Sequence, residues 1–183
     1  MNRIHIDPNI YTTAPGGEGR LPVEMDTYAL LDSLVIGYLR LDHGATATVD
    51  DCADVERILG IEICKNLFLC NGAKTAYYLL MMPGEKRYQA PLLSRQLHTS
   101  RLSFADADSM QKYLRIRPGS VSVLGLMNDE THAVRLLIDR DVLRHKFIGC
   151  HPCVNTSSLR VSMTDILNKF LPHTGHVPTV VEL

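Results

Sequence analysis

Hydrophobic residues recur along this chain with two periods, and the period separates predicted helices from predicted strands. Apolar residues at helical spacing between positions 28 and 35 predict a first helix with Asp26 or Thr27 as its N-cap. Thr48 and Asp51 have the spacing of a capping box, so a second helix is predicted to begin there. The remaining predicted helices cover residues 92–97, residues 106–114 and a final stretch that is capped by Ser162 and ends at Pro172.

Apolar runs bounded by turn residues predict the strands. Residues 61–70 and 75–82 form a predicted hairpin, with Asn71 and Gly72 marking the turn between them. Because strands and helices alternate irregularly, the pattern favours an α/β (α+β) fold with a mixed sheet over a regular doubly wound sheet. The other predicted strands cover residues 36–41, 121–127, 133–138, 147–150 and 159–161.

Composition narrows the class of protein. Glycines and prolines crowd residues 1–22, which predicts an irregular N-terminal arm followed by one domain over residues 23–183. The formal net charge of -1 argues against a strongly basic nucleic-acid-binding chain, although a local basic patch suffices to hold the end of an RNA. No apolar run has the length of a membrane span, and five cysteines without a secretory signal favour the cytoplasm.

A lysine and an asparagine interrupt the most apolar strand pattern. Period-two alternation places Lys65 on one face with Leu67 and Leu69, and it places Asn66 on the opposite face with Phe68. Burying either polar side chain is costly unless it finds a partner or a cleft, and an ammonium at a cleft wall can bind phosphate or carboxylate. The pattern also allows Lys65 to lie on an exposed edge, where its stem would cover apolar surface.

A glycine turn is the second candidate feature. Gly119 and Ser120 open the run that continues to Ser122 and Val123. Glycine lets backbone N–H groups approach a ligand closely, and such groups can hold a developing oxyanion. A plain turn that leads into a strand explains the same residues.

The segment between positions 150 and 155 is the third feature. Cys150 and Cys153 have the CxxC spacing of a redox pair or of half a zinc site, but no second such pair follows, so we expect no metal. His151 and Asn155 are interpreted as polar residues that line a cleft or fix the loop. His43, which precedes a glycine, fits a structural role when it is considered alone.

Together these segments resemble the YbaK/prolyl-tRNA-synthetase-associated domain family, and within it the free-standing PrdX/ProXp-ala deacylases of alanyl-tRNA(Pro). The resemblance runs in order over roughly residues 26 to 172 of the chain. The motifs that carry it are Leu41-Asp42-His43, Thr48-Val49-Asp50-Asp51, Cys64-Lys65-Asn66-Leu67-Phe68-Leu69, Leu102-Ser103-Phe104-Ala105, Arg117-Pro118-Gly119-Ser120-Val121-Ser122 and His151-Pro152-Cys153-Val154-Asn155.

The resemblance implies a curved, barrel-like mixed sheet flanked by helices, and hydrolysis of an aminoacyl ester on the terminal adenosine of a mischarged tRNA. It implies no cofactor and no metal. Val123 stands where the family typically has a proline, which leaves the amino-acid preference open. The residues that the resemblance assigns to catalysis are Lys65, Asn66, Gly119 and Ser120, and those that it assigns to substrate binding are His151, Val123, Ser122, Asn155 and His43.

The expected partner is the acceptor end of mischarged tRNA, with prolyl-tRNA synthetase as a further candidate partner. Lys86, Arg87, Arg95 and Arg101 are candidate basic contacts to the RNA. Three alternatives stay open: editing of cysteinyl- or seryl-tRNA on the same fold, a non-catalytic module that binds tRNA or a synthetase, and a thiol redox protein.

Overall fold

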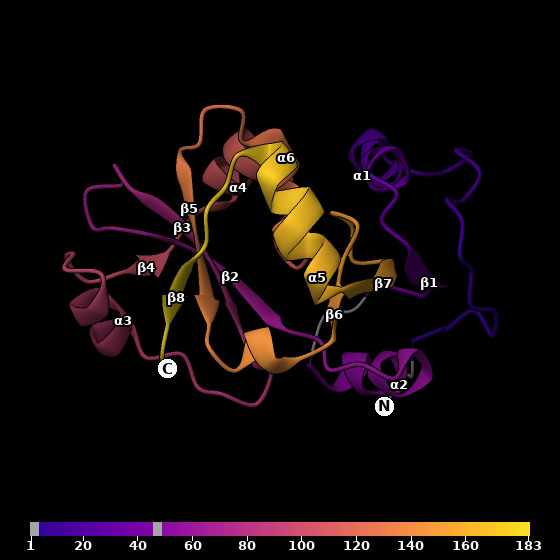
Figure 1. Ribbon diagram of the computed structural model, residues 1–183, viewed down its shortest axis with the longest axis horizontal. Helices are drawn as coiled ribbons and strands as arrows, with labels where there is room; N and C mark the ends of the chain where they lie inside the picture. Colours follow the sequence, from indigo (N-terminus) through magenta and orange to yellow (C-terminus); the bar gives the residue numbers. More distant parts are fainter. Residues whose placement is uncertain (1–3, 46–48) are drawn as a thin grey trace.

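Two β-sheets organise the computed structural model, which describes residues 4–45 and 49–183 (Figure 1). The smaller sheet is antiparallel and has the order β1-β7-β6, with β1 at Tyr38–Asp42, β6 at Phe147–Cys150 and β7 at Ser157–Ser162. The larger sheet has the order β4-β2-β3-β5-β8. Its strands are β2 (Lys65–Cys70), β3 (Tyr77–Met82), β4 (Ser103–Phe104), β5 (Val134–Asp139) and β8 (Thr179–Val181).

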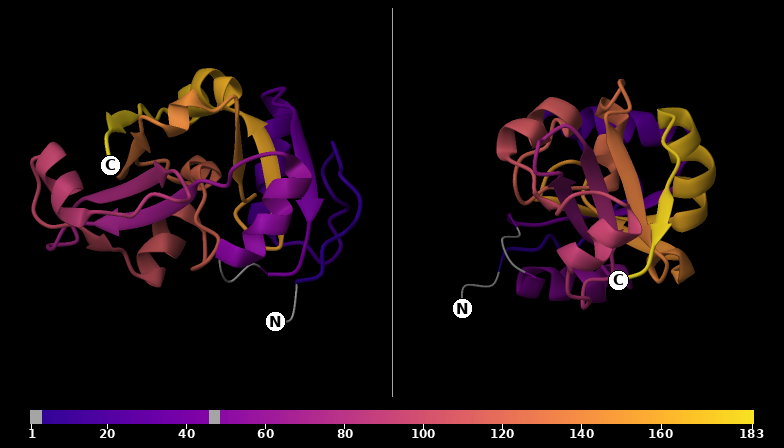
Figure 2. Two further views of the ribbon diagram at one scale, coloured as in Figure 1. Left: turned by 90° about the horizontal axis from the view of Figure 1, so that it is seen from below. Right: turned by 90° about the vertical axis from the view of Figure 1, so that its left-hand side faces the viewer.

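The larger sheet contains both strand directions. β2 pairs antiparallel with β3 and β4, whereas β5 pairs parallel with β3 and β8. The predicted mixed sheet flanked by helices is therefore confirmed. The expected curved sheet is built as two sheets that lie at an angle, with the C-terminal helical segment across the space between them (Figures 1 and 2).

The two sheets meet where β6 approaches the segment before β2. Ile63 forms a parallel bridge with Gly149. A Cβ atom on Gly149 would lie 2.6 Å from the Ile61 side chain and 3.2 Å from the Ile63 Cα, so only glycine permits this approach. This contact brings the β6–β7 loop close to the beginning of β2.

Both faces of the larger sheet are buried. The main core includes Phe68 and Leu79 from one face, together with residues of the smaller sheet and of the C-terminal helical segment. The opposite face carries Leu69 and Leu80, which pack with Leu93 of α3. The helices are α1 (Pro22–Ser33), α2 (Val49–Leu59), α3 (Ala90–Gln96), α4 (Ala107–Leu114), α5 (Met163–Asp165) and α6 (Leu171–Thr174).

The first helix begins earlier than the sequence predicts. α1 starts at Pro22, because proline fits the first turn of a helix, where its missing N–H is not needed. The predicted N-caps Asp26 and Thr27 are wrong, since both residues lie inside the helix. The predicted capping box of the second helix involves Thr48, which lies outside the described residues.

Two later elements also differ from the prediction. Residues 121–127 do not form a strand; a short 3-10 helix, η1 (Val123–Asn128), begins after Ser122, whose Oγ accepts a hydrogen bond from the Leu124 N–H. The final helix does not end at Pro172, because a π-helical segment, η3 (Ile166–Phe170), carries the chain into α6 and places the proline in its first turn. The predicted cap at Ser162 is confirmed by its bond from the Asp165 N–H.

The N-terminal arm lies against the outer edge of the smaller sheet. Residues 4–21 contain no helix or continuous strand, but Ile6 bridges His43 and Tyr11 bridges Arg40. The Arg40 guanidinium stacks 4.4 Å from the centre of the Tyr11 ring. The arm then turns into α1, so its last residues reach the site described below. No helix in the described ranges is long and apolar enough to cross a membrane.

Candidate active site

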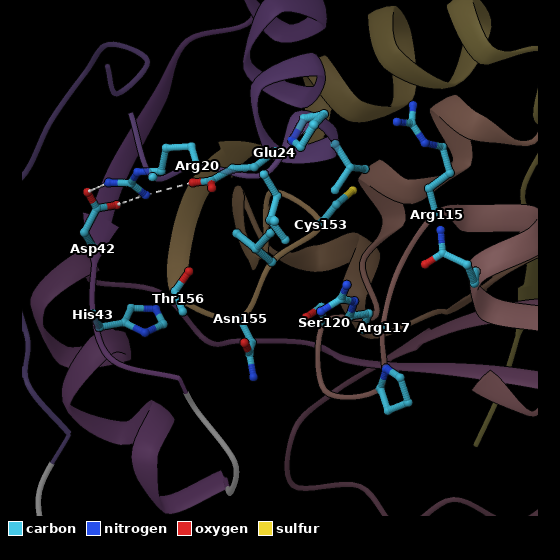
Figure 3. A pocket seen from close by; sticks show the side chains of 17 residues that line it. Arg20, Glu24, Asp42, His43, Arg115, Arg117, Ser120, Cys153, Asn155 and Thr156 are labelled. Atoms are coloured by element: carbon cyan, nitrogen blue, oxygen red, sulfur yellow. Dashed lines mark hydrogen bonds and ion pairs between the residues drawn. The ribbon is translucent and has the colours of Figure 1, made fainter. Parts of the chain in front are cut away.

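A cavity of about 690 Å³ lies between α1, the turn after α4 and the β6–β7 loop (Figure 3). A cavity of this size can enclose a nucleotide-sized ligand. Three predicted site residues, His43, Ser120 and Asn155, line it together. The other lining residues are Gly19, Arg20, Leu21, Pro22, Val23, Glu24, Asp42, Gln111, Arg115, Arg117, Pro118, Cys153, Val154 and Thr156.

One wall of the cavity is a closed ion-pair network. Arg20 contacts Glu24 at 2.8 Å and Asp42 at 2.5 Å, and Arg40 contacts the same Asp42 oxygen at 2.5 Å. Glu24 is only 2% exposed, and burial raises the pKa of its carboxyl while Arg20 opposes that effect. Two arginines thus neutralise two carboxylates, and this wall has no spare charge.

The opposite wall is built on a tight turn. The Ser120 N–H donates to the Arg117 carbonyl at 3.1 Å, and Gly119 between them has φ of +88°, the geometry of a type II turn with proline and glycine at its centre. A Cβ on Gly119 would lie 3.4 Å from the Asn155 Nδ2. The glycine turn and the β6–β7 loop, which carries Asn155, therefore lie next to each other.

This turn limits which backbone groups can hold an oxyanion. The Ser120 N–H is used within the turn and is not free for a ligand, which corrects the expectation that both N–H groups serve this purpose. The Gly119 N–H has no acceptor within the described ranges. Ser122 and Val123 do not line the cavity: the Ser122 Oγ caps η1, and Val123 is fully buried in the main core.

His43 and His151 are joined through one buried hydroxyl. The His43 Nδ1 lies 2.7 Å from the Gly44 carbonyl, and its Nε2 lies 2.9 Å from the Ser158 Oγ. The His151 Nδ1 lies 2.9 Å from the Ser157 carbonyl and 3.5 Å from the same Ser158 Oγ. Since a carbonyl only accepts, both Nδ1 atoms carry the proton, and Ser158 donates to the His43 Nε2.

These bonds leave the two histidines with different numbers of ring nitrogens that can still bind a ligand or a proton. Both nitrogens of His43 are engaged, so this residue supports the cavity wall. His151 does not line the cavity; its ring centre lies 6.3 Å from that of the lining residue His43. The His151 Nε2 carries a lone pair and has no partner among residues 4–45 and 49–183. Burial lowers the pKa of both rings, so both are neutral at pH 7. A neutral imidazole with a free Nε2 can accept a proton from water.

Lys65 is placed away from this cavity. It begins β2, and its Nζ donates to the Lys86 carbonyl at 2.9 Å. Because β4 pairs only with Leu69 and Cys70, the Lys65 end of β2 is an edge of the larger sheet, which is how the strand accommodates a charged residue. Lys65 is not one of the residues that line the cavity in Figure 3.

Asn66 faces the main core, on the opposite side of β2 from Lys65. Its Nδ2 donates to the Cys64 carbonyl at 3.1 Å, and this bond orients the side-chain amide. The Oδ1 is buried and has no hydrogen-bond donor among the described residues. Asn66 does not line the cavity. A buried acceptor without a donor costs about 1–3 kcal/mol, and this cost is the structural feature that makes Asn66 a candidate to bind a polar ligand group.

The cysteines and Lys86 are engaged in other ways. Cys150 and Cys153 are free, 2% and 3% exposed, and burial raises the pKa of both thiols, that of Cys153 to about 12. Such thiols are poor nucleophiles, which argues against the redox alternative. The Lys86 Nζ pairs with Asp139 at 2.8 Å and Asp141 at 2.7 Å, so its charge is already neutralised within the protein, and its role as an RNA contact stays a prediction.

Sequence reasoning missed several residues of the site. Arg20 and Glu24 belong to the segment that was predicted to be an irregular arm and its junction, and nothing in their spacing pairs them with Asp42. Ser158 lies in a polar run that reads as an ordinary loop. Arg117 belongs to the motif of the glycine turn, but that motif predicts no role for its guanidinium group. Charge and hydrogen-bond partners across the fold identify these residues, and periodicity does not.

Comparisons with known proteins identify the family of this chain. Residues 43–169 match the family described as the aminoacyl-tRNA editing domain. The chain is 30% identical over 155 residues to the prolyl-tRNA editing protein ProX of Acetoanaerobium sticklandii, covering 85% of this chain and 94% of that protein. It is 29% identical over 171 residues to the prolyl-tRNA synthetase associated domain-containing protein 1 of Danio rerio, covering 91% of each.

A solved structure shares the fold. A crystal structure described as that of a candidate trans-editing enzyme for prolyl-tRNA synthetase superposes with a TM-score of 0.65 and 14% identity, covering 90% of this chain and 99% of that one. The family match spans His43, the start of β2, the Arg117 turn and the β6–β7 loop. The chain therefore belongs to the aminoacyl-tRNA editing domain family.

Proposed function

We propose that this protein is a trans-editing deacylase that hydrolyses the ester of mischarged tRNA(Pro), with alanyl-tRNA(Pro) as its preferred substrate. The observation that carries the proposal is the convergence of the Gly119 turn with Asn155 at a nucleotide-sized cavity, in a chain of an aminoacyl-tRNA editing family. An aminoacyl ester is already activated, so the enzyme needs to position a water molecule and stabilise an oxyanion rather than supply its own nucleophile.

The proposed reaction uses His151 as the base. A water oxygen bonds to the ester carbonyl carbon while the His151 Nε2 takes one of its protons. The tetrahedral intermediate collapses, the bond from the carbonyl carbon to the ribose oxygen breaks, and the proton passes to that oxygen. Alanine and tRNA with a free terminal hydroxyl result. The bond between the His151 Nδ1 and the Ser157 carbonyl keeps the lone pair on Nε2.

The Gly119 N–H is the proposed oxyanion donor. It lies on the turn that contacts Asn155, and it has no acceptor in the described part of the chain. Removing one preorganised donor of this kind typically costs about 10²–10³ in kcat. The Ser120 N–H contributes indirectly, because its bond to the Arg117 carbonyl fixes the turn.

Asn66 and Lys65 have proposed roles on opposite faces of β2. The Asn66 Oδ1 would accept a hydrogen bond from a ribose hydroxyl or from the substrate α-ammonium group, which its missing donor supports. The Lys65 ammonium has three N–H donors and gives one to the Lys86 carbonyl, so two remain for a phosphate or ribose group that reaches the sheet edge.

The assay that tests the function is deacylation of a panel of charged tRNA(Pro). Purified protein should release alanine from alanyl-tRNA(Pro) much faster than it releases cysteine, serine or proline from the corresponding esters. A synthetase pocket separates substrates that differ by one methylene by only about 1–3 kcal/mol, so a second site that excludes proline is needed. If every ester survives while the tRNA is bound, the protein is a non-catalytic binding module instead.

A different amino-acid preference is the alternative that the panel ranks directly. Val123 motivated it, because this residue replaces a typical proline. Its side chain is fully buried in the main core and does not line the cavity, so it has no direct route to the substrate. Preference for the cysteinyl or seryl ester would nevertheless replace alanine in the proposal.

The role of Lys65 is tested by substitution. Lys65→Ala should lower kcat/KM for alanyl-tRNA(Pro) by about 10²-fold if the ammonium positions the substrate. Lys65→Arg should recover part of that loss, since it keeps the charge. Lys146→Ala, which removes an exposed lysine between η2 (Val142–Arg144) and β6, is the matched control. Equal rates in Lys65→Ala and Lys146→Ala would remove Lys65 from the site.

A further inference from the structure

The charges that line the cavity do not balance across it. Figure 3 shows Arg20 and Asp42 on one side, with Arg115 and Arg117 on the other. On the first side, Arg20 and Arg40 neutralise Glu24 and Asp42. The second side contributes no carboxylate to the lining. The cavity therefore presents a net positive side toward any ligand that enters it.

Arg117 is the uncommitted charge on that side. Its side chain is exposed, and it has no hydrogen bond or ion pair with the described residues. Its backbone carbonyl accepts the bond that closes the Gly119 turn. The guanidinium is therefore attached directly to the turn that supplies the proposed oxyanion donor. An anion that it binds would therefore lie near the Gly119 turn.

Arg115, two residues before Arg117, adds a second positive charge to the same side of the cavity. It follows α4 in the left-handed conformation, with φ of +53°, which directs the chain from the helix toward the turn. Its Nη1 lies 3.2 Å from Asp26 and 3.4 Å from Asn128, and both members of the Asp26 pair are about half exposed. Exposed pairs contribute little free energy, so Arg115 can exchange this partner for a ligand anion.

We propose that Arg117, assisted by Arg115, binds an internucleotide phosphate at the 3′ end of the RNA substrate. This inference rests on the proposed deacylase function and assigns the orientation of its substrate. The cavity is far larger than an alanyl group requires, and a nucleotide attached to the ester would fill it. Guanidinium groups bind phosphate oxygens in a bidentate manner, which suits a fixed position next to a turn.

Binding measurements test this assignment without requiring turnover. A fluorescent single-stranded RNA that ends in CCA should bind Arg117→Ala about five- to twentyfold more weakly than the wild-type protein. The slope of log Kd against log salt should fall by about 0.7 for each lost phosphate contact on a single strand. Arg117→Lys should keep the slope and lose part of the affinity. Arg144→Ala removes an exposed arginine that does not line the cavity and is the matched control.

Hydrolysis separates phosphate binding from ester chemistry. Arg117→Ala should lower kcat/KM for alanyl-tRNA(Pro) by a similar factor, and it should leave hydrolysis of 3′-alanyl-adenosine, which has no phosphate, unchanged. An equal loss on both substrates would overturn the phosphate assignment. So would a salt slope equal to that of Arg144→Ala, or free adenosine monophosphate binding as tightly as the RNA. A wild-type protein that binds the RNA with this Arg117 dependence but hydrolyses neither substrate would retain the phosphate site and lose the proposed function.

Discussion

The two sides of the cavity use their polar groups in opposite ways. On the α1 side, Arg20, Glu24 and Asp42 satisfy one another, and a fourth residue, Arg40, completes the network. On the side of the turn and the β6–β7 loop, the Arg117 guanidinium has no protein partner among the described residues. The Nε2 of His151, whose ring lies behind the lining residue His43 and not in the cavity wall itself, has no partner among them either. Groups whose bonding capacity is already used hold the shape of a site, and groups with spare capacity are the ones that can act on a ligand.

The largest effect that this comparison predicts is at His151. His151→Asn should lower kcat for alanyl-tRNA(Pro) by about 10²–10⁴-fold, because it removes the free Nε2 that serves as the base. The asparagine amide can still donate to the Ser157 carbonyl, so folding should be retained. Single-turnover deacylation measures the rate, and thermal unfolding checks the fold.

His43 is the internal control for that result. Both of its ring nitrogens are engaged, with the Gly44 carbonyl and with Ser158. His43→Asn should therefore reduce the free energy of unfolding more than it reduces kcat, with a rate loss below about tenfold. If His43→Asn abolishes hydrolysis while His151→Asn leaves it intact, the assignment of His151 as the base and of His43 as a supporting residue is wrong.

The next effect is at the glycine turn. Gly119→Ala places a side chain where φ is +88° and where its Cβ would lie 3.4 Å from the Asn155 Nδ2. The strained turn should move the proposed donor and lower kcat by about 10²-fold. Gly72→Ala is the matched control, since its Cβ would meet no atom within 4 Å in the β2–β3 turn. Full activity in Gly119→Ala would exclude this turn as the oxyanion site.

The α1 side should respond in stability rather than in rate. Glu24→Ala leaves Arg20 with one carboxylate instead of two and opens a buried position, so it should cost about 2–4 kcal/mol of unfolding free energy. Glu24→Gln keeps an acceptor for Arg20 and should cost less. Denaturant unfolding measures both values. At a temperature where the variants are folded, kcat should change only a few-fold; a loss comparable to that of His151→Asn would show that this side takes part in the reaction.

The sequence predicts elements that local patterns determine, and it does not predict elements that depend on tertiary contacts. The β2–β3 hairpin follows from local alternation and turn residues, and it was predicted with the correct pairing. The run from Val123 to Leu126 is equally apolar but winds into a 3-10 helix, in which Gly125 packs so closely against Ile116 that a Cβ there would lie 2.4 Å from the Ile116 side chain. That contact is tertiary, and no local pattern contains it.

The same distinction applies to the chemistry. The motifs led to Gly119 and Asn155, which do meet, and to His151, whose free nitrogen is apparent only from its partners. Alternation correctly put Lys65 and Asn66 on opposite faces of β2, but it does not tell which of the two faces lies toward the cavity. Strand periodicity gives the relative orientation of side chains and leaves the absolute orientation to tertiary packing.

The smallest predicted effect is a pH dependence of stability that arises from the two histidines. Burial lowers the pKa of His43 and His151 in the folded protein below the ordinary value of 6.5. Between the lowered pKa and 6.5, the unfolded chain binds more protons than the folded protein, so stability is fully present above pH 6.5 and is lost as the pH falls below it. Each ring can contribute at most about 1.4 kcal/mol per pH unit.

This dependence is measured as a difference, so that carboxyl groups such as Glu24 cancel. Denaturant unfolding at several pH values between 5 and 8 should give a wild-type curve that falls on the acid side, and His43→Asn should remove part of that slope. The rate should decline at lower pH, around the lowered pKa of His151 in the folded protein, because protonation of its Nε2 removes the base. In His43→Asn the rate should still decline there even though the stability slope is reduced. If His43→Asn removes both the acid decline in stability and the acid decline in rate, the two rings act as one unit. His43 could then not be described as a supporting residue that is separate from the reacting His151.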